Sequence, residues 1–479
     1  MKKYGVLLPV FSLPGKGGIG RFGDAYPFID FLAEAGQDFW QILPLLKADY
    51  SGSPYQSDSA FAIDPMYIDP YLLIADGYLM PEEVLDTSRE KRAERKQTEM
   101  LKTAYSRFKT SPPEDYADFL SESGFWLDDY ALFSVIAESE GTPDFTKWKD
   151  TLSRRESAAL DRYRKEHADS MDFIKFVQYE ADRQWQGVRA YAAKKGIKII
   201  GDLPMYVSHA SADVWANREI FMLDEDGRPT LVAGVPPDAF TEDGQLWGNP
   251  VYNIPEMRKS GYAWQMLRFK RTARLCDVVR LDHFRGYESF YAVKAGSPNA
   301  RKGEWLEGLG AEFFDLIAAK FPSLEIIAED LGIVTDAVRE LIKHTGYPNM
   351  KVLQFGLDGD LENDHLPKNY SENCVAYTGT HDNDTCVGWY KSLSLKEKRA
   401  VKRLVKKRLT ENISDAMIRA LIESKAKYVI VPMQDWLREG HASRINLPGS
   451  VGSHNWTYRL SAIPDRKTAS RMRKITHRE

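Results

Sequence analysis

The sequence has little cysteine: Cys276, Cys374 and Cys386 are the only three among 479 residues. Such a sparse, odd set argues against a disulfide framework and for a reducing compartment, so we expect a cytoplasmic protein. No two cysteines have the C-x-x-C spacing, and no H-x-H or H-x-x-x-H pair occurs among the nine histidines. These absences exclude the common zinc-binding patterns, and we predict no metal site.

Long hydrophobic runs are also missing, so the sequence predicts no membrane-spanning segment. The first apolar run, Gly5–Phe11, is short, contains Pro9 and leads to no small-residue cleavage site. We therefore interpret it as a strand and not as a signal peptide. The formal net charge is only −4, which implies no general attraction to nucleic acids or anionic membranes. Residues 395–409 are strongly basic but keep an apolar stripe, which is typical of an ordinary surface helix.

Glycines at positions 15, 17 and 20 give the G-x-G-x-x-G pattern of dinucleotide-binding loops. In such loops the first glycine comes directly at a strand end, whereas here residues 11–14 intervene. No acidic residue closes the next predicted strand either. We favour a flexible glycine loop ahead of a helix at 24–35.

Eight short apolar runs are present, and most are separated by helical patterns. This alternation predicts an α/β protein, a (β/α)8 TIM barrel with helical and loop insertions. The predicted strands are residues 5–10, 39–43, 197–202, 276–282, 324–330, 351–355, 374–378 and 428–431.

The organisation along the chain changes once. From residue 81 to 170 charges dominate and apolar residues recur at helical spacing, as in Phe125–Phe133, so we predict a helical insertion subdomain. Residues 1–80 would then be the first part of the barrel and residues 171–479 its remainder. A long stretch rich in turn formers, residues 230–255, is predicted to be a loop that covers the site.

Acidic residues follow four of the predicted strands: Asp202, Asp282, Glu329 and Asp382. TIM barrels carry their sites at the C-terminal strand ends, so we expect these carboxylates to lie together. Arg280 is two residues before Asp282 and lies on the same side of an extended chain, where it favours the ionised carboxylate. The alternative is a buried arginine–aspartate pair that only stabilises the fold.

Two reaction classes use several carboxylates in one cleft. Metal-assisted hydrolysis could draw on Asp282, Asp382 and Asp384 with His283 and His381, but these lack metal-ligand spacing. Retaining glycosyl transfer needs one ionised and one protonated carboxyl group. Asp282 beside Arg280 fits the nucleophile, and Glu329 after an apolar run fits the acid. Which of the two is protonated stays open at this point.

These residues resemble the four short regions shared by the α-amylase clan. Further stretches along almost the whole chain are similar to the amylomaltase (4-α-glucanotransferase, disproportionating enzyme) family. They are Ser53-Pro54-Tyr55-Gln56, Trp126–Phe133, Gly234–Asp238, Gln245–Pro250, Arg280–Gly286, Ala328–Gly332, Gly379–Asn383, Asn446-Leu447-Pro448-Gly449 and Asn455-Trp456.

The resemblance implies roles for individual residues. Asp282 would be the nucleophile, Glu329 the general acid and base, and Asp382 the transition-state stabiliser. Substrate contacts would come from Ser53, Tyr55, Asp238, Trp247, Arg280, Asp358 and His381. Tyr55 would stack on the donor sugar, Arg280 and His381 would hold it, and the loop with Asp238 and Trp247 would cover it. The family needs no cofactor or metal.

The implied function is transfer of α-1,4-glucan segments from a donor malto-oligosaccharide, starch or glycogen-type chain to the 4-OH of an acceptor. No nucleic acid or membrane partner is implied, and we expect a monomer or weak homo-oligomer. Residues 46–50 depart from the threonine- and glycine-rich version typical of the family, so acceptor preference stays open. The alternatives are an α-1,4-glucan hydrolase on the same barrel and a catalytically silent glucan-binding protein.

Overall fold

The computed structural model describes residues 2–49, 51–88, 92–237, 242–450, 452 and 454–477. Its centre is a closed barrel of eight parallel strands in the order β1-β12-β11-β10-β9-β6-β3-β2. The strands are β1 (Lys3–Leu7), β2 (Phe39–Gln41), β3 (Lys198–Leu203), β6 (Val278–Leu281), β9 (Glu325–Ala328), β10 (Asn349–Val352), β11 (Cys374–Tyr377) and β12 (Tyr428–Pro432). The predicted (β/α)8 TIM barrel is therefore confirmed.

The sixth barrel strand lies earlier in the chain than its apolar run predicted. The run at 351–355 was expected to be extended, but the strand is Asn349–Val352 and the chain then forms α14 (Leu353–Gly356). β10 pairs with β11 only from Asn349 to Val352. Since the backbone beyond has no strand partner, its apolar run turns into a short helix.

A second sheet stands beside the barrel and was not predicted. Its four antiparallel strands have the order β5-β4-β7-β8. They are β4 (Leu231–Val235), β5 (Gln245–Pro250), β7 (Ser289–Lys294) and β8 (Gly303–Glu307). β4 and β5 belong to the stretch 230–255 that was expected to be a loop. At Gly234 a Cβ atom would lie 2.4 Å from the carbonyl oxygen of Gln245, so the close pairing of these strands requires glycine.

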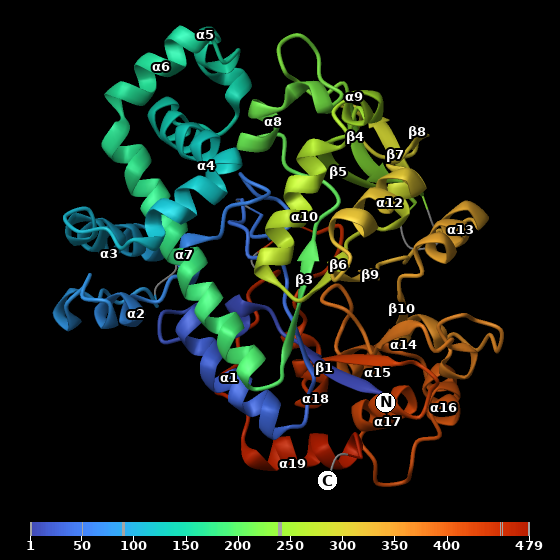
Figure 1. The fold of residues 1–479 in the computed structure, drawn as a ribbon. Helices are drawn as coiled ribbons and strands as arrows, with labels where there is room; N and C mark the ends of the chain where they lie inside the picture. The colour runs from blue at the N-terminus through green and yellow to red at the C-terminus, as the bar shows by residue number, and fades with distance from the viewer. Residues whose placement is uncertain are drawn as a thin grey trace.

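The described regular elements of residues 81–170 are helical, as the pattern indicated, while the division into domains stays a prediction. They include α3 (Ala93–Phe108), α4 (Asp115–Glu140), α5 (Asp150–Ser153) and α6 (Ser157–Glu166), followed by the long α7 (Ala168–Lys194). Phe108 joins α3 to α7 through its ring contact with Phe176, at 4.6 Å between centroids. Figure 1 shows this helical group along one side of the molecule, opposite the second sheet.

Figure 1 also shows the other helices of the described residues. They are α1 (Phe22–Glu34), α2 (Pro70–Ala75), α8 (Ala212–Ala216), α9 (Ile254–Lys259), α10 (Ala263–Leu275), α11 (Arg285–Glu288), α12 (Gly310–Lys320), α13 (Asp336–Thr345), α15 (Cys386–Ser392), α16 (Leu395–Leu404), α17 (Ile413–Ile422), α18 (Met433–Trp436) and α19 (Arg466–Ile475). No helix in the described ranges is long and apolar enough to cross a membrane.

The barrel interior is layered by the alternation of its strands. Near the C-terminal ends, Arg280 bonds Asp202, and the Tyr377 hydroxyl donates to Gln41 Oε1 at 2.8 Å. Two residues earlier on the same four strands the inward side chains are apolar, and they border a cavity of about 300 Å³. Its lining is Phe39, Ile200, Val278, Leu324, Glu325, Ile326, Ile327, Tyr347, Pro348, Asn373, Val375, Tyr428 and Ile430. The barrel interior therefore has hydrogen-bonded side chains next to the site and a cavity between apolar side chains toward the opposite end.

Candidate active site

Arg280 is the centre of the carboxylate cluster. Its side chain is 5 % exposed, and Nη1 donates to both oxygens of Asp202 at 2.7 Å and to Asp282 Oδ1 at 3.2 Å. Its Nη2 is 3.9 Å from Glu329 Oε2. The strands β3, β6 and β9 are neighbours in the barrel, so their C-terminal ends bring these groups together. One guanidinium thus brings together three of the four carboxyl groups that were expected to lie at the strand ends, Asp202, Asp282 and Glu329.

Glu329 is a buried member of the cluster, with its side chain 10 % exposed, as is Asp202 at 0 %. Burial raises the pKa of Glu329 to about 8, against the attraction of Arg280 and with the added repulsion of Asp282. Its oxygens accept from two backbone amides, His283 N at 2.7 Å and Leu331 N at 3.0 Å. These bonds fix the carboxyl group and favour its ionised form, but the effect of burial on its pKa is larger.

Asp282 is the accessible member. Its side chain is 27 % exposed, against 10 % for Glu329. Its backbone amide donates to Leu203 O at 3.1 Å, which fixes the chain just beyond the end of β6. The two acids therefore lie on one arginine in different surroundings, one open and one enclosed.

His283 connects the cluster to the second sheet. Its backbone is left-handed, with φ of 49°, and burial lowers the pKa of its ring to about 4. The ring meets the indole of Trp247 edge-on at 5.0 Å. Trp247 lies on β5, so this predicted contact residue does reach the cluster. Because the lowered pKa makes the His283 ring neutral, Arg280 supplies the positive charge next to Asp202 and Asp282.

Tyr55 lies on the other side of Asp202, to which its hydroxyl donates at 2.6 Å. Its ring stacks on His381 with centroids 5.3 Å apart and planes at 16°. Trp456 completes the group at about 6 Å from both rings. Ser53 supports this arrangement, since its hydroxyl accepts from the Tyr55 amide at 3.3 Å. The structure thus brings Ser53, Tyr55 and His381 beside the carboxylates.

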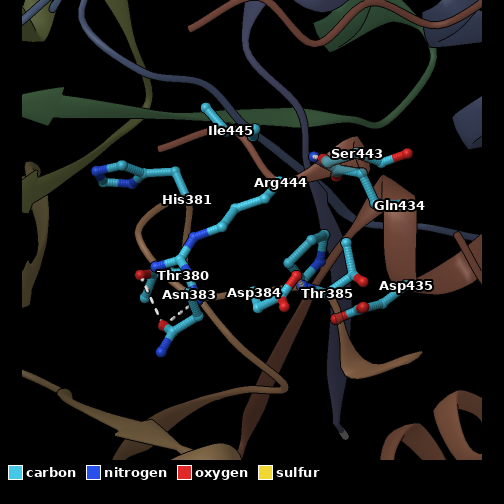
Figure 2. A pocket seen from close by; sticks show the side chains of 11 residues that line it. Thr380, His381, Asn383, Asp384, Thr385, Gln434, Asp435, Ser443, Arg444 and Ile445 are labelled. Atoms are coloured by element: carbon cyan, nitrogen blue, oxygen red, sulfur yellow. Dashed lines mark hydrogen bonds between the residues drawn. The ribbon is translucent and has the colours of Figure 1, made fainter. Parts of the chain in front are cut away.

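Asp382 follows His381 and is 43 % exposed. Its Oδ1 accepts from Asn446 Nδ2 at 2.6 Å, and its Oδ2 is 3.4 Å from His381 Nε2. Behind this turn is a cavity of about 10 Å³, lined in part by Thr380, His381 and Arg444 (Figure 2). The cavity has room for one water at most and is not a sugar site.

One predicted contact residue forms its hydrogen bonds in its own loop, and another is not described. Asp358 is exposed, and its carboxylate accepts from Asp360 N and Asn363 Nδ2, both at 2.9 Å, in its own loop. Asp238 lies outside the described residues. Within the described residues no group of three or more histidine, cysteine or acidic side chains is arranged to hold a metal ion.

Some site residues received no role in the sequence analysis. Asp202 was noted at a strand end, but its bonds to Arg280 and Tyr55 were not anticipated. Asn446 and Trp456 belong to motifs that carried the family resemblance, and that resemblance was the signal that could have found them. Arg444 stands next to one of those motifs without belonging to it.

The fold and its strand-end site define a (β/α)8-barrel enzyme. The chain belongs to the 4-alpha-glucanotransferase family, whose model matches residues 8–464. It is 41% identical to the 4-alpha-glucanotransferase of Clostridium butyricum over 462 residues, 94% of each chain. It is 40% identical to that of Thermus thermophilus over 477 residues, 96% of this chain and 95% of the other.

Solved structures agree with this assignment. The amylomaltase from Streptococcus agalactiae, in complex with acarbose, superposes with a TM-score of 0.95 at 35% identity, and all of both chains is covered. The amylomaltase from Corynebacterium glutamicum has a TM-score of 0.76 at 17% identity, with 100% of this chain and 74% of the other covered, and shares the fold. The predicted family and enzyme class, 4-α-glucanotransferase, are thereby confirmed.

Proposed function

We propose that this protein is a retaining 4-α-glucanotransferase in which Asp282 forms a covalent glycosyl intermediate. Its donors would be malto-oligosaccharides or starch- and glycogen-type chains, and its acceptor group the 4-OH of a glucan or glucose. The observation that carries the proposal is the contrast between Asp282, which is 27 % exposed, and Glu329, whose pKa is raised by burial at the same arginine. A retaining mechanism needs one carboxylate and one carboxylic acid.

The steps follow from these positions. Glu329 donates its proton to the glycosidic oxygen while Asp282 attacks the anomeric carbon, so the bond to the leaving sugar breaks as the ester to Asp282 forms. The ionised Glu329 then removes the proton of the acceptor hydroxyl, which displaces Asp282 and regenerates the acid. Asp382 would stabilise the positive charge of both transition states.

Substrate binding is assigned to the surrounding rings. Tyr55, His381 and Trp456 form an aromatic group beside Asp202, and such faces stack on sugars. Trp247 on β5 would cover the glucan from the other side, together with Asp238, and Asp358 would contact it from its exposed loop. We keep the cytoplasm as the proposed location, because all three cysteines are buried and free.

Hydrolysis is the competing function, because water can open the same intermediate. The test is incubation of the purified protein with maltotriose alone. We expect glucose and a ladder of longer α-1,4 oligosaccharides, with little rise in total reducing ends, because transfer conserves their number. Only shorter sugars, with reducing ends rising in step with consumption, would identify a hydrolase. No turnover at all would favour the silent glucan-binding alternative.

A further inference from the structure

Asp382 contacts a segment that follows β12 in the sequence, residues 444–446. Asn446 contacts the Asp382 turn twice, through its backbone amide to His381 O at 3.1 Å and through Nδ2 to Asp382 Oδ1 at 2.6 Å. Ile445 is 2 % exposed, and its carbonyl accepts from Trp456 N at 2.7 Å. The segment is therefore anchored before Asn446 reaches the carboxylate.

Arg444 links the backbone of Asp382 to the backbone of Asn446. Its guanidinium donates to two main-chain carbonyls, Asp382 O through Nη2 and Asn446 O through Nε at 2.7 Å. Figure 2 shows the side chain extending from the segment of Ile445 toward Thr380 and Asn383. Arg444 thus joins the backbone of the residue that bears the carboxylate to the backbone of the residue that orients it.

The carboxylate depends on this connection. At 43 % exposure Asp382 is the most open of the three proposed catalytic acids, and its short side-chain hydrogen bond comes from Asn446. Charge stabilisation in a transition state requires a group that is already oriented, and a misplacement of about 1 Å can cost about 100-fold in rate. A displaced Asn446 would let the Asp382 carboxylate rotate toward solvent.

We propose that Arg444 is a positioning residue for Asp382, acting through the two carbonyls and Asn446. This inference rests on the proposed function, in which Asp382 serves the reaction. It assigns Arg444 no contact with substrate.

The test compares Arg444→Met, which keeps the apolar stem, with Arg444→Lys, which keeps the charge. Arg438→Met is the matched control, because Arg438 pairs with Asp415 and does not bond the Asp382 turn. Each variant is assayed on maltotriose and on α-glucosyl fluoride, and its unfolding temperature is measured. We expect Arg444→Met to lower kcat about 10- to 100-fold on both donors with a small change in KM, because the lost interaction belongs to the transition state. Arg444→Lys should recover part of this loss, and Arg438→Met should behave like the wild type.

A double-variant cycle separates positioning from general damage. In an Asp382→Asn background, Arg444→Met should cause less than about a twofold further loss, because there is no carboxylate left to orient. An equal loss in both backgrounds, or a kcat of Arg444→Met within about twofold of the wild type, would overturn the inference. Should Arg444→Met fail to fold, the cycle is run with Arg444→Lys. If Asp382→Asn itself keeps full activity, it is the proposed role of Asp382 that fails.

Discussion

Asp282 and Glu329 carry the same chemical group in two environments. Asp282 projects beyond β6 and is 27 % exposed, whereas Glu329 is 10 % exposed and its oxygens accept from two backbone amides. The pKa of Glu329, raised to about 8, favours Glu329 over Asp282 as the proposed acid, a choice that the sequence left open. The main cause of the raised pKa is burial of the Glu329 side chain. This burial depends on the packing of the whole barrel and not on the residues next to Glu329 in the sequence.

Replacement of the nucleophile gives the first prediction at this scale. Asp282→Asn should lower turnover of maltotriose by at least about 1,000-fold, because the covalent step is lost. The unfolding temperature should change little, since the amide can still accept from Arg280. Asp336→Asn, at a side chain that is 98 % exposed on α13, is the control and should keep full activity. Near-normal turnover of Asp282→Asn would remove this residue from the mechanism.

The raised pKa of Glu329 gives a prediction about pH. The acid form is the active one in the first step, so kcat/KM for maltotriose should fall as the pH rises through about 8. The fall should be much weaker with α-glucosyl fluoride, whose leaving group needs little protonation. The measurement is kcat/KM against pH for both donors. A limb of equal depth for the two donors would assign the titration to another group.

At the scale of elements, the barrel strands were predictable and the second sheet was not. A barrel strand such as β11 is buried along its length, so it reads as an uninterrupted apolar run. β5 has the sequence QLWGNP, whose glycine and closing proline are typical of a loop and hide the alternating exposure that the strand shows in the structure. Its partner β4 pairs onward with β7, more than fifty residues later, and no local pattern announces that pairing.

The candidate site divides in the same way. Asp202, Asp282, Glu329 and Asp382 could be found because strand ends of a barrel converge. The partners of Asp382 could not be found in this way, since Arg444 and Asn446 follow β12 in irregular chain, and tertiary contacts bring them to the turn after β11. Their positions have no periodicity that points to a site. Only the family motif that contains Asn446 pointed to that residue.

The loosely filled layer of the barrel gives a prediction about stability. Val375→Ile on β11 adds a methylene group at the wall of the 300 Å³ cavity, and we expect the free energy of unfolding to rise by about 0.5–1 kcal/mol. Val188→Ile is the matched control, because Val188 is 0 % exposed on α7 and does not line this cavity. It should destabilise the protein by about 1–3 kcal/mol through overpacking. Thermal and denaturant unfolding of both variants check this, and a loss for Val375→Ile would show that the space is not available.

At the scale of the molecule, the barrel is closed by two strands that lie far apart in the sequence, β1 and β12. β1 pairs with β12 from Lys3–Tyr428 to Leu7–Pro432, and helices α3–α6 lie between β2 and β3 in the sequence. During synthesis on the ribosome, the strand partner of Lys3, Tyr428, is therefore added 425 residues later (428 − 3). At a translation rate of roughly 5–20 residues per second, β1 is synthesised about 20–85 s before β12 is available to complete the barrel. During that time β1 lacks one of its two neighbours, so we expect the nascent chain to be most prone to mispairing, and most dependent on chaperones, before β12 is made.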